Sequence, residues 1–306
     1  MVNAMTENKT PRVSVITPSL NHGQFMRETI ESILAQTFTD YEHIVVDGGS
    51  TDNTLDILES YPHVHWISEK ETDKNAILEA YRKAIAMARG DYVIQCCVTD
   101  GFLDRNWFAS CVELLDGDAE VSLVWATSQQ MSEEGRMGKV INPEFLDKSP
   151  PQKRDFLAFW FASGIGFPEF NYMVRRSVLD ECFPQRNCAE PMSVNPTWTF
   201  NYNFNTRGYL PQFIPVIASY VRHHHDQRGI RLYEIEDPAS HRYIEKMKEF
   251  RKKLFKGKIR HCFRNGKSEI IGYLDSSDVS TIRKAYLQHF VKYKIRKRLT
   301  EILHAL

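Results

Sequence analysis

The chain has 306 residues, of which 42% are hydrophobic and 25% are charged, and its formal net charge at pH 7 is zero. This composition excludes a disordered or fibrous protein and suits one large domain with extensions, or two domains. The zero net charge hides an asymmetry, because fifteen Lys or Arg stand against four Asp or Glu from Arg251 onward, whereas the rest holds 24 basic and 35 acidic residues. A basic tail on an acidic body suits an anionic partner or a solvated surface.

No segment is typical of a targeting or membrane-spanning element. The amino-terminal MVNAMTENKTPR lacks the apolar stretch of a signal peptide, and the longest apolar stretch, Phe156 to Phe167, is too short to cross a bilayer. The six cysteines form no C-x-x-C pair, which favours reduced thiols. We therefore expect a cytoplasmic protein.

The amino-terminal region predicts a strand–helix–strand–helix unit. β-branched residues at Val13–Thr17 predict a buried strand that ends at Pro18. Helical spacing follows from Gln24 to about Gln36, and a second apolar run covers His43–Val46. Such a unit implies a parallel sheet with a right-handed crossover.

Two polar loops follow the two predicted strands, at the sheet edge where folds of this kind bind ligands. They are Thr17–Gly23 and Asp47–Asp52. Asp47 can accept hydrogen bonds from a base or ribose, and glycines let a ligand approach the backbone. A plain turn, with Ser50 or Asp52 capping the next helix, has the same composition. Neither G-x-G-x-x-G nor G-x-x-x-x-G-K-[ST] occurs, which argues against the two commonest nucleotide-binding folds.

Apolar spacing predicts further elements along the chain. The predicted strands cover Tyr61–Ser68, Asp91–Cys97, Val121–Ala126, Asn171–Val174 and Tyr209–Tyr220, and the predicted helices cover Ala76–Arg89, Asn106–Leu115, Arg175–Glu181 and Thr197–Thr206. Glu133-Glu134-Gly135 predicts a hairpin turn between antiparallel strands. A charged helix over Glu234–Phe255, a basic hinge over Lys256–Gly266 and a long helix over Val279–Leu306 complete the chain.

The run VSVITPSLN, a helix containing E-S-I-L-A-Q-T-F and the run YEHIVVDGGSTDNT together resemble the amino-terminal signature of family 2 glycosyltransferases. This resemblance implies the GT-A fold, an α/β, Rossmann-like mixed sheet flanked by helices, here followed by a C-terminal helical extension. It also implies an inverting enzyme that moves a sugar from a nucleotide sugar, most often UDP-linked, to a hydroxyl of a glycan or lipid-linked acceptor in surface polysaccharide or glycoconjugate synthesis.

The resemblance assigns a nucleotide pocket to the first loops. It implies that Thr17 and Pro18 line the nucleobase pocket, that Asp47 binds the base, and that Ser50 and Asp52 shape the same pocket. Further along, the run EKETDKN loosely matches another segment of the family. This match makes Asp73 a candidate for the nucleotide pocket, and a solvated loop is the alternative.

A weakened metal motif follows the predicted strand Asp91–Cys97. The family carries a D-x-D or S-D-D motif here, but Cys97 and Thr99 replace its first carboxylates, so only Asp100 is left beside the nucleotide-site position Thr99. Asp100 can hold Mg²⁺ or Mn²⁺ together with a diphosphate and water, because these ions often use few protein ligands. Weaker metal binding and metal-independent turnover both stay open.

Two further site predictions come from the resemblance. Arg222 and His224 match an R-x-H element beside the diphosphate, and residues two apart on a strand share a face. A chance His run in a loop is the alternative. The catalytic base must be a carboxylate that takes the acceptor's proton. The helix Thr197–Thr206 contains no acid, so we expect Glu190, or otherwise Glu169, to be the base.

We expect a catalytic domain over residues 1–230, with a nucleotide-sugar half at about 11–126 and an acceptor half at about 127–230, and a basic helical extension over 231–306. In the last helix Ile282, Tyr286, Phe290 and Tyr293 lie near one stripe surrounded by basic residues. This pattern suits peripheral attachment to the inner face of the cell membrane, or docking against the catalytic domain or a second subunit of a homo-oligomer. No nucleic-acid partner is expected.

Two other functions stay open. A nucleotidyltransferase of the same fold class would want a basic, Gly-rich loop after the first strand, whereas S-L-N-H-G contains no Lys or Arg. A non-catalytic or metal-independent nucleotide- or glycan-binding protein would explain why positions 97, 99 and 197 carry no carboxylate.

Overall fold

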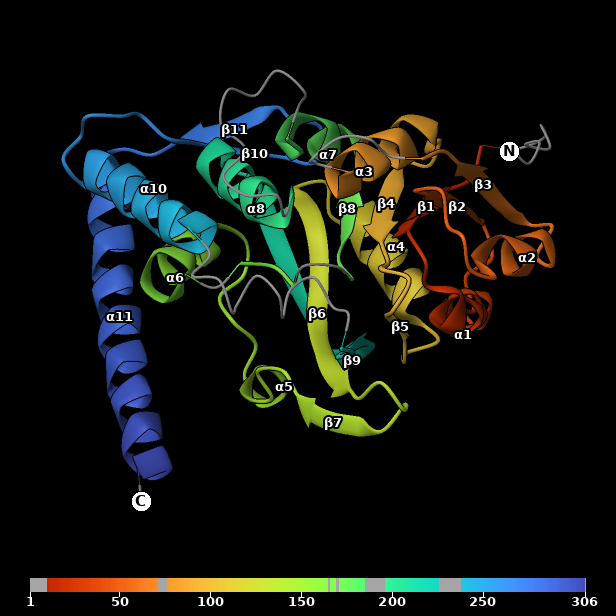
Figure 1. Cartoon of the computed structure of the whole chain (residues 1–306). Coiled ribbons are helices and arrows are strands. Elements are labelled where there is room, and N and C mark those ends of the chain that lie inside the picture. Colours follow the sequence, from red (N-terminus) through yellow and green to blue (C-terminus); the bar gives the residue numbers. More distant parts are fainter. Residues whose placement is uncertain are drawn as a thin grey trace.

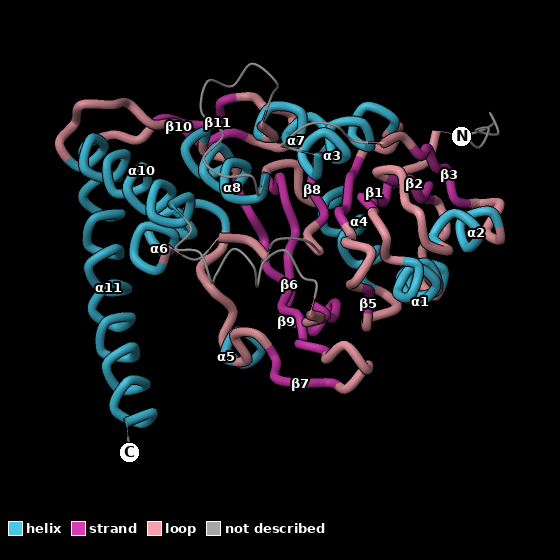
Figure 2. Tube along the Cα trace, viewed as in Figure 1, coloured by secondary structure: helices cyan, strands magenta, loops and turns pink. Residues whose placement is uncertain are grey.

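One large mixed β-sheet runs through the middle of the molecule, with helices packed along it (Figure 1 and Figure 2). The structure is a computed structural model that describes residues 10–70, 76–164, 166–168, 171–184, 196–225 and 238–305. Within these ranges the strand order is β3-β2-β1-β4-β8-β6-β9-β5, with β7 paired to β6.

The first part of the chain alternates strands and helices. Its elements are β1 (Val13–Ser19), α1 (Gly23–Leu34), β2 (Tyr41–Asp47), α2 (Thr54–Glu59), β3 (Val64–Ser68), α3 (Ala76–Met87), β4 (Tyr92–Gln95), β5 (Gly101–Phe102) and α4 (Trp107–Gly117). β1 pairs in parallel with β2 and β4, and β2 pairs in parallel with β3. The predicted strand–helix–strand–helix unit and its parallel sheet are therefore confirmed.

The next part adds antiparallel strands and more helices. Its elements are β6 (Val121–Met131), β7 (Met137–Val140), α5 (Glu144–Asp147), a 3₁₀ turn η1 (Lys153–Asp155), α6 (Phe156–Ser163), β8 (Met173–Arg175), α7 (Arg176–Cys182), α8 (Pro196–Arg207) and β9 (Leu210–Arg222). β6 pairs antiparallel with β7 and β8, and parallel with β9. The predicted hairpin turn is confirmed, since Gly135 adopts a φ of 82° between β6 and β7.

The carboxyl-terminal part consists of α10 (Pro238–Phe255), β10 (Cys262–Arg264), β11 (Ile270–Tyr273) and α11 (Ser276–Ala305). The prediction of a plain hinge over Lys256–Gly266 is wrong in its second half, because β10 lies there and pairs antiparallel with β11. Phe263 is buried, and the Arg264 N–H donates to Gly208 O at 2.8 Å. These long-range contacts make the segment a strand although its local sequence is basic and polar.

Alternation along the central strands gives the sheet two buried faces. Ile16 of β1 joins a cluster with residues of α3, α6, α7 and α8, whereas Val13 and Val15 join a second cluster with residues of α4. Successive strand residues point to opposite faces, so a strand covered on both sides must be apolar throughout. The carboxyl ends of β1, β2 and β4 consequently meet at one edge, held rigidly from both faces.

Candidate active site

The loops after β1 and β2 are hydrogen-bonded to each other along their length. Four backbone N–H groups donate across the gap at 2.7 to 2.9 Å: Gly48 to Ser19 O, Asn21 to Ser50 Oγ, Thr51 to Asn21 Oδ1 and Gly23 to Asp52 Oδ2. Asn21 has a φ of 53°, a left-handed conformation that asparagine tolerates better than most residues. The two loops predicted from the sequence to share the ligand edge therefore form one structural unit.

Asp47 lies at the centre of that unit, and its side chain is fully buried. Its carboxylate accepts hydrogen bonds from Gly49 N at 3.0 Å, Ser50 N at 2.8 Å and Ser68 Oγ at 2.7 Å, and also from the Ser50 hydroxyl. Gly49 has a φ of 87°, and a Cβ there would lie 2.9 Å from Lys70 Cα, so glycine is required. Asp47 thus shapes the loop; the base contact predicted for it stays a prediction.

Thr17 and Pro18 are also buried within the sheet edge. Thr17 Oγ1 lies 3.0 Å from His43 Nε2 on the neighbouring strand. Burial, together with nearby His63 and His65, lowers the pKa of His43 to about 3, so its ring is neutral near pH 7. The Thr17 side chain therefore faces β2 in this structure.

Asp52 joins the starts of two helices. Its carboxylate accepts hydrogen bonds from Gly23 N at the start of α1, and from Thr54 N at 3.0 Å and Thr54 Oγ1 at 2.5 Å at the start of α2. Partial burial alone would raise the pKa of Asp52, but these hydrogen bonds lower it below its ordinary value. The prediction that Asp52 or Ser50 caps the next helix is wrong in its residue, because the N-cap of α2 is Asn53, which makes no side-chain cap hydrogen bond. Asp52 lies one residue earlier, and its carboxylate bonds the first residues of both α1 and α2.

The loop after β4 brings Thr99 and Asp100 to the same edge, and both are buried. Thr29 of α1 holds this loop, because its hydroxyl lies 2.6 Å from Val98 O and 2.8 Å from Asp100 O. Asp100 Oδ1 accepts the N–H of Arg222 at 3.1 Å. The end of β9 is therefore fastened to the end of β4.

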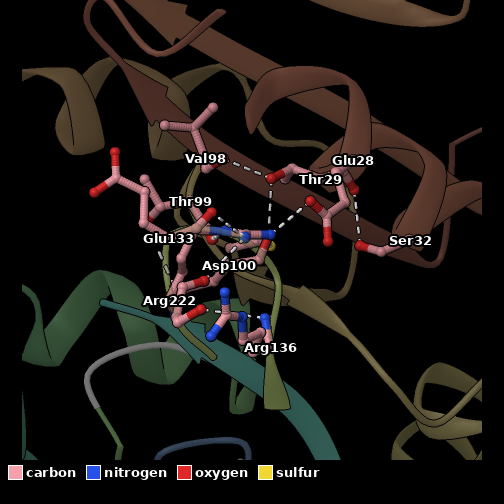
Figure 3. A network of polar contacts seen from close by, with 11 residues as sticks. Glu28, Thr29, Ser32, Val98, Thr99, Asp100, Glu133, Arg136 and Arg222 are labelled. Atoms are coloured by element: carbon pink, nitrogen blue, oxygen red, sulfur yellow. Dashed lines mark hydrogen bonds and ion pairs between the residues drawn. The ribbon is translucent and has the colours of Figure 1, made fainter. Parts of the chain in front are cut away.

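Arg222 is the hub of this network (Figure 3). Its guanidinium donates to Thr99 O at 3.2 Å, to Ser132 O at 3.3 Å, to Glu133 O at 3.1 Å and to Glu28 Oε2 at 2.5 Å. The side chain of Arg222 is only 2% exposed, whereas that of Glu28 is 50% exposed. The guanidinium thus ties α1, the β4 loop and the β6–β7 hairpin together with its own donors.

His224 packs beside the same cluster. Its ring centroid lies 5.4 Å from that of Phe25 and 5.6 Å from that of His22, and the Arg222 guanidinium lies 5.0 Å from the Phe25 ring. Arg222 and His224 therefore both pack against the Phe25 ring, although β9 ends at Arg222 and His224 lies beyond the strand. Within the described ranges no group of three or more His, Cys, Asp or Glu side chains has the arrangement of a metal site. The two metal candidates predicted from the sequence, Asp100 and His224, both lie beside Arg222, and metal binding by them stays a prediction.

Three candidates lie outside the described residues: Asp73, Glu169 and Glu190. In the described part of the predicted base region, α8 carries no acidic residue. Glu28 and Thr29 of α1 were not predicted as site residues, because no motif marks them. They do not share a helix face, since Thr29 is buried and Glu28 is half exposed.

No helix in the part of the chain that the structure describes has the length and apolarity needed to cross a membrane. The described cysteines, Cys96, Cys97, Cys111, Cys182 and Cys262, are all free thiols.

The sequence of this chain is similar to those of known glycosyltransferases. Residues 14–183 match the family model described as glycosyl transferase family 2. A chondroitin synthase of Escherichia coli is 31% identical over 140 residues, a match that covers 44% of this chain but only 20% of that protein. The matched segment thus spans about a fifth of the length of this relative.

Solved structures match over more of the chain. Staphylococcus aureus TarS in complex with UDP-GlcNAc has a TM-score of 0.56 at 16% identity, covering 92% of this chain and 73% of that one. The mannosyltransferase PcManGT from Pyrobaculum calidifontis, in complex with GDP-Man and Mn²⁺, has a TM-score of 0.52 at 17% identity, covering 93% and 87%. The expected GT-A fold, a mixed sheet flanked by helices with a C-terminal helical part, is confirmed.

Proposed function

The chain belongs to glycosyl transferase family 2, and from this premise we propose that it moves a sugar from a UDP-linked nucleotide sugar to a hydroxyl of a glycan or lipid-linked acceptor, with inversion at the anomeric carbon. The observation that carries the proposal is the pair of loops after β1 and β2, which are bonded to each other at the edge where β4 delivers Asp100. Open α/β sheets bind ligands at this edge. The UDP-GlcNAc complex of TarS, a protein of the same fold, supports a uridine nucleotide.

The donor would lie across the ends of β1, β2 and β4. Thr17, Pro18, Asp47, Ser50 and Asp52 would form the base and ribose side of the pocket, since their loops make up the hydrogen-bonded unit described above. Asp73 and Thr99 would complete the nucleotide site. In this proposal Asp47 acts chiefly by fixing the loop backbone, because its carboxylate already accepts hydrogen bonds from three donor residues of the protein.

Asp100 and His224 would face the diphosphate. A divalent cation held by Asp100 and the diphosphate, with His224 beside it, would neutralise the charge that develops on the leaving group. The Mn²⁺ complex of PcManGT supports such an ion. Arg222 would act on the diphosphate indirectly, by holding the Thr99–Asp100 loop in place. Its guanidinium donates to Thr99 O, and its backbone N–H donates to the Asp100 carboxylate.

The base would be Glu190, or otherwise Glu169. It would take the proton from the acceptor hydroxyl as that oxygen attacks the anomeric carbon, and the nucleoside diphosphate would leave on the opposite side. Residues of about 127–230 would form the acceptor half, after a donor half at about 11–126. We further propose a cytoplasmic protein attached peripherally to the inner face of the cell membrane through the 231–306 extension.

Product analysis with a panel of nucleotide sugars tests this proposal. The full chain is incubated with each donor and with lipid-linked and soluble glycan acceptors, and the products are analysed by mass spectrometry. Transfer from a UDP-sugar, with inverted anomeric configuration by NMR, is the expected result. Retention of configuration, or transfer only from a donor with another base, would refute the corresponding part.

A binding protein without turnover is the second candidate. It is favoured by Cys97 and Thr99 at the positions of the usual carboxylates, and by the absence of an acid in α8. UDP binding without any product across the panel would support it. Product formation with purified chain would exclude it.

A further inference from the structure

The long helix α11 packs on the body along one face only. Val279, Ile282 and Tyr286 pack against the main core, and the Tyr286 ring lies 4.5 Å from the Arg251 guanidinium and 5.7 Å from the Phe255 ring. Figure 1 shows the C-terminal half of α11 extending past α6 and α10. For Ile282 and Tyr286, docking against the body is therefore the arrangement that the structure adopts.

A second stripe of the same helix faces away from the body. Leu287, Val291 and Ile295 are 50%, 53% and 56% exposed. Residues four apart lie on one helix face, and Leu287 is turned by about 100° from the packed Tyr286. Among the other large hydrophobic residues that the structure describes, Tyr273 is 51% and Leu20 is 46% exposed, and none of the rest exceeds 44%. Single exposed aliphatic residues are ordinary, but three in register on one helix form an apolar edge.

Positive charge surrounds this apolar edge. The helix contains seven Lys or Arg and two Asp or Glu, and Arg283, Lys284 and Lys292 beside the stripe are exposed. A helix with aliphatic side chains next to Lys and Arg suits the surface of a bilayer that contains anionic lipids. In a pair of chains joined along this stripe, the same cations would face each other and repel. Three side chains also fall far short of the roughly 800 Å² that each partner contributes to a stable interface.

We propose that Leu287, Val291 and Ile295 insert into the headgroup region of an anionic membrane while Arg283, Lys284 and Lys292 bind its phosphates. The inference rests on the proposed peripheral location and names the surface responsible; it does not depend on sugar transfer. The contact is reversible, because three aliphatic side chains and a few cations anchor far less strongly than a spanning helix. It would hold the catalytic part next to lipid-linked acceptors.

Vesicle flotation of the full chain tests the proposal. The vesicles contain either equimolar phosphatidylglycerol and phosphatidylethanolamine, or phosphatidylcholine alone. The test variant carries Leu287→Gln, Val291→Gln and Ile295→Gln, which keep helix propensity and remove the apolar edge. The matched control carries Ile141→Gln, Ile244→Gln and Ile270→Gln, three exposed isoleucines on other segments. Calorimetric UDP binding and light scattering are measured on the same samples.

The wild type and the control are expected to float with the anionic vesicles and not with phosphatidylcholine, and their binding should fall as salt rises. The test variant should bind the anionic vesicles about tenfold or more weakly, with UDP binding unchanged. No flotation of the wild type, or equal flotation of the test variant, would overturn the proposal. A wild-type dimer that the test variant loses would assign the stripe to a second copy instead. Failure of every sample to bind UDP would refute the proposed donor and leave this inference standing.

Discussion

Replacement of Arg222 by methionine separates two roles for this residue: support of the Thr99–Asp100 loop and direct contact with a bound nucleotide. The side chain has a similar length, but it cannot donate to the backbone oxygens of Thr99, Ser132 and Glu133 or to the carboxylate of Glu28. Breaking a buried charge network by removing one partner costs about 3–5 kcal/mol. Glu28→Gln should cost much less, about 1 kcal/mol or below, because that side chain is half exposed and its charge is screened by water.

Urea denaturation, followed by fluorescence and circular dichroism, measures both losses as shifts of the midpoint at constant slope. Arg136→Met is the matched control, since Arg136 is exposed on the same hairpin. Arg222→Met should lower the unfolding free energy by several kcal/mol and also weaken UDP binding, because the Thr99–Asp100 loop loses its support. If Arg222→Met unfolded like wild type but no longer bound UDP, Arg222 would contact the ligand directly and the network described here would have no structural role.

Three other predictions concern the loops and the acid sensitivity of the fold. Asp47→Asn removes a hydrogen-bond acceptor from the centre of the loop unit, so UDP affinity measured by calorimetry should fall at least about tenfold. The control Asp56→Asn changes an exposed residue and should bind UDP normally. Equal affinity of both variants would disprove the role of Asp47 in the loop. Asp100→Asn keeps an acceptor for the Arg222 N–H but loses charge, so divalent-metal stimulation should disappear and turnover should fall by roughly 10²-fold; a wild type indifferent to EDTA would show that Asp100 binds no metal. Burial lowers the pKa of His43 to about 3 and that of His261 to about 4. Below pH 6.5 the unfolded chain therefore binds more protons than the folded chain. The free energy of unfolding should consequently fall as the pH is lowered from 6.5 toward 4. His261→Phe should flatten this slope by up to about 1.4 kcal/mol per pH unit, and an unchanged slope in urea titrations would contradict the assignment.

Local pattern was enough to predict the first strands and helices of the fold. The β-branched run at Val13–Thr17 and the helical spacing after Gln24 are signals within single elements, and each matches β1 or α1 to within a few residues. The short loops between them leave little freedom in how the elements connect. For the same reason, the meeting of the loops after β1 and β2 followed from the parallel pairing alone.

Contacts between distant segments escaped prediction. β10 forms because the chain packs against the turn between α8 and β9, where Gly208 has a φ of 81° and a Cβ would lie 1.9 Å from Cys262 O. Nothing in the local sequence around Cys262 announces this pairing, since strand formation depends on its neighbours in space. Likewise, the ion pair of Arg222 with Glu28 joins residues 194 positions apart.

For the polar side chains of the site, too, the sequence indicated position along the chain but not the hydrogen-bond partners. Arg222 and His224 lie close together as predicted, but through a shared contact with Phe25 and not through a common strand face, since β9 ends at Arg222. The spacing also could not show that protein groups accept the hydrogen bonds of the Arg222 guanidinium. In the same way, the sequence marks Asp47 as a loop acid, and only the structure shows its carboxylate turned toward Gly49, Ser50 and Ser68. Hydrogen-bond partners depend on tertiary geometry, which a one-dimensional pattern does not contain.

A calorimetric titration of UDP into the full chain, with Mn²⁺ and again after EDTA, tests the central claim most directly. We expect saturable one-site binding of UDP that is stronger than that of GDP, tighter with Mn²⁺ than without, and at least about tenfold weaker in Asp47→Asn. No heat of binding for UDP under either condition, while the chain is folded by circular dichroism, would contradict the assignment of the edge formed by β1, β2 and β4 as a nucleotide-sugar site.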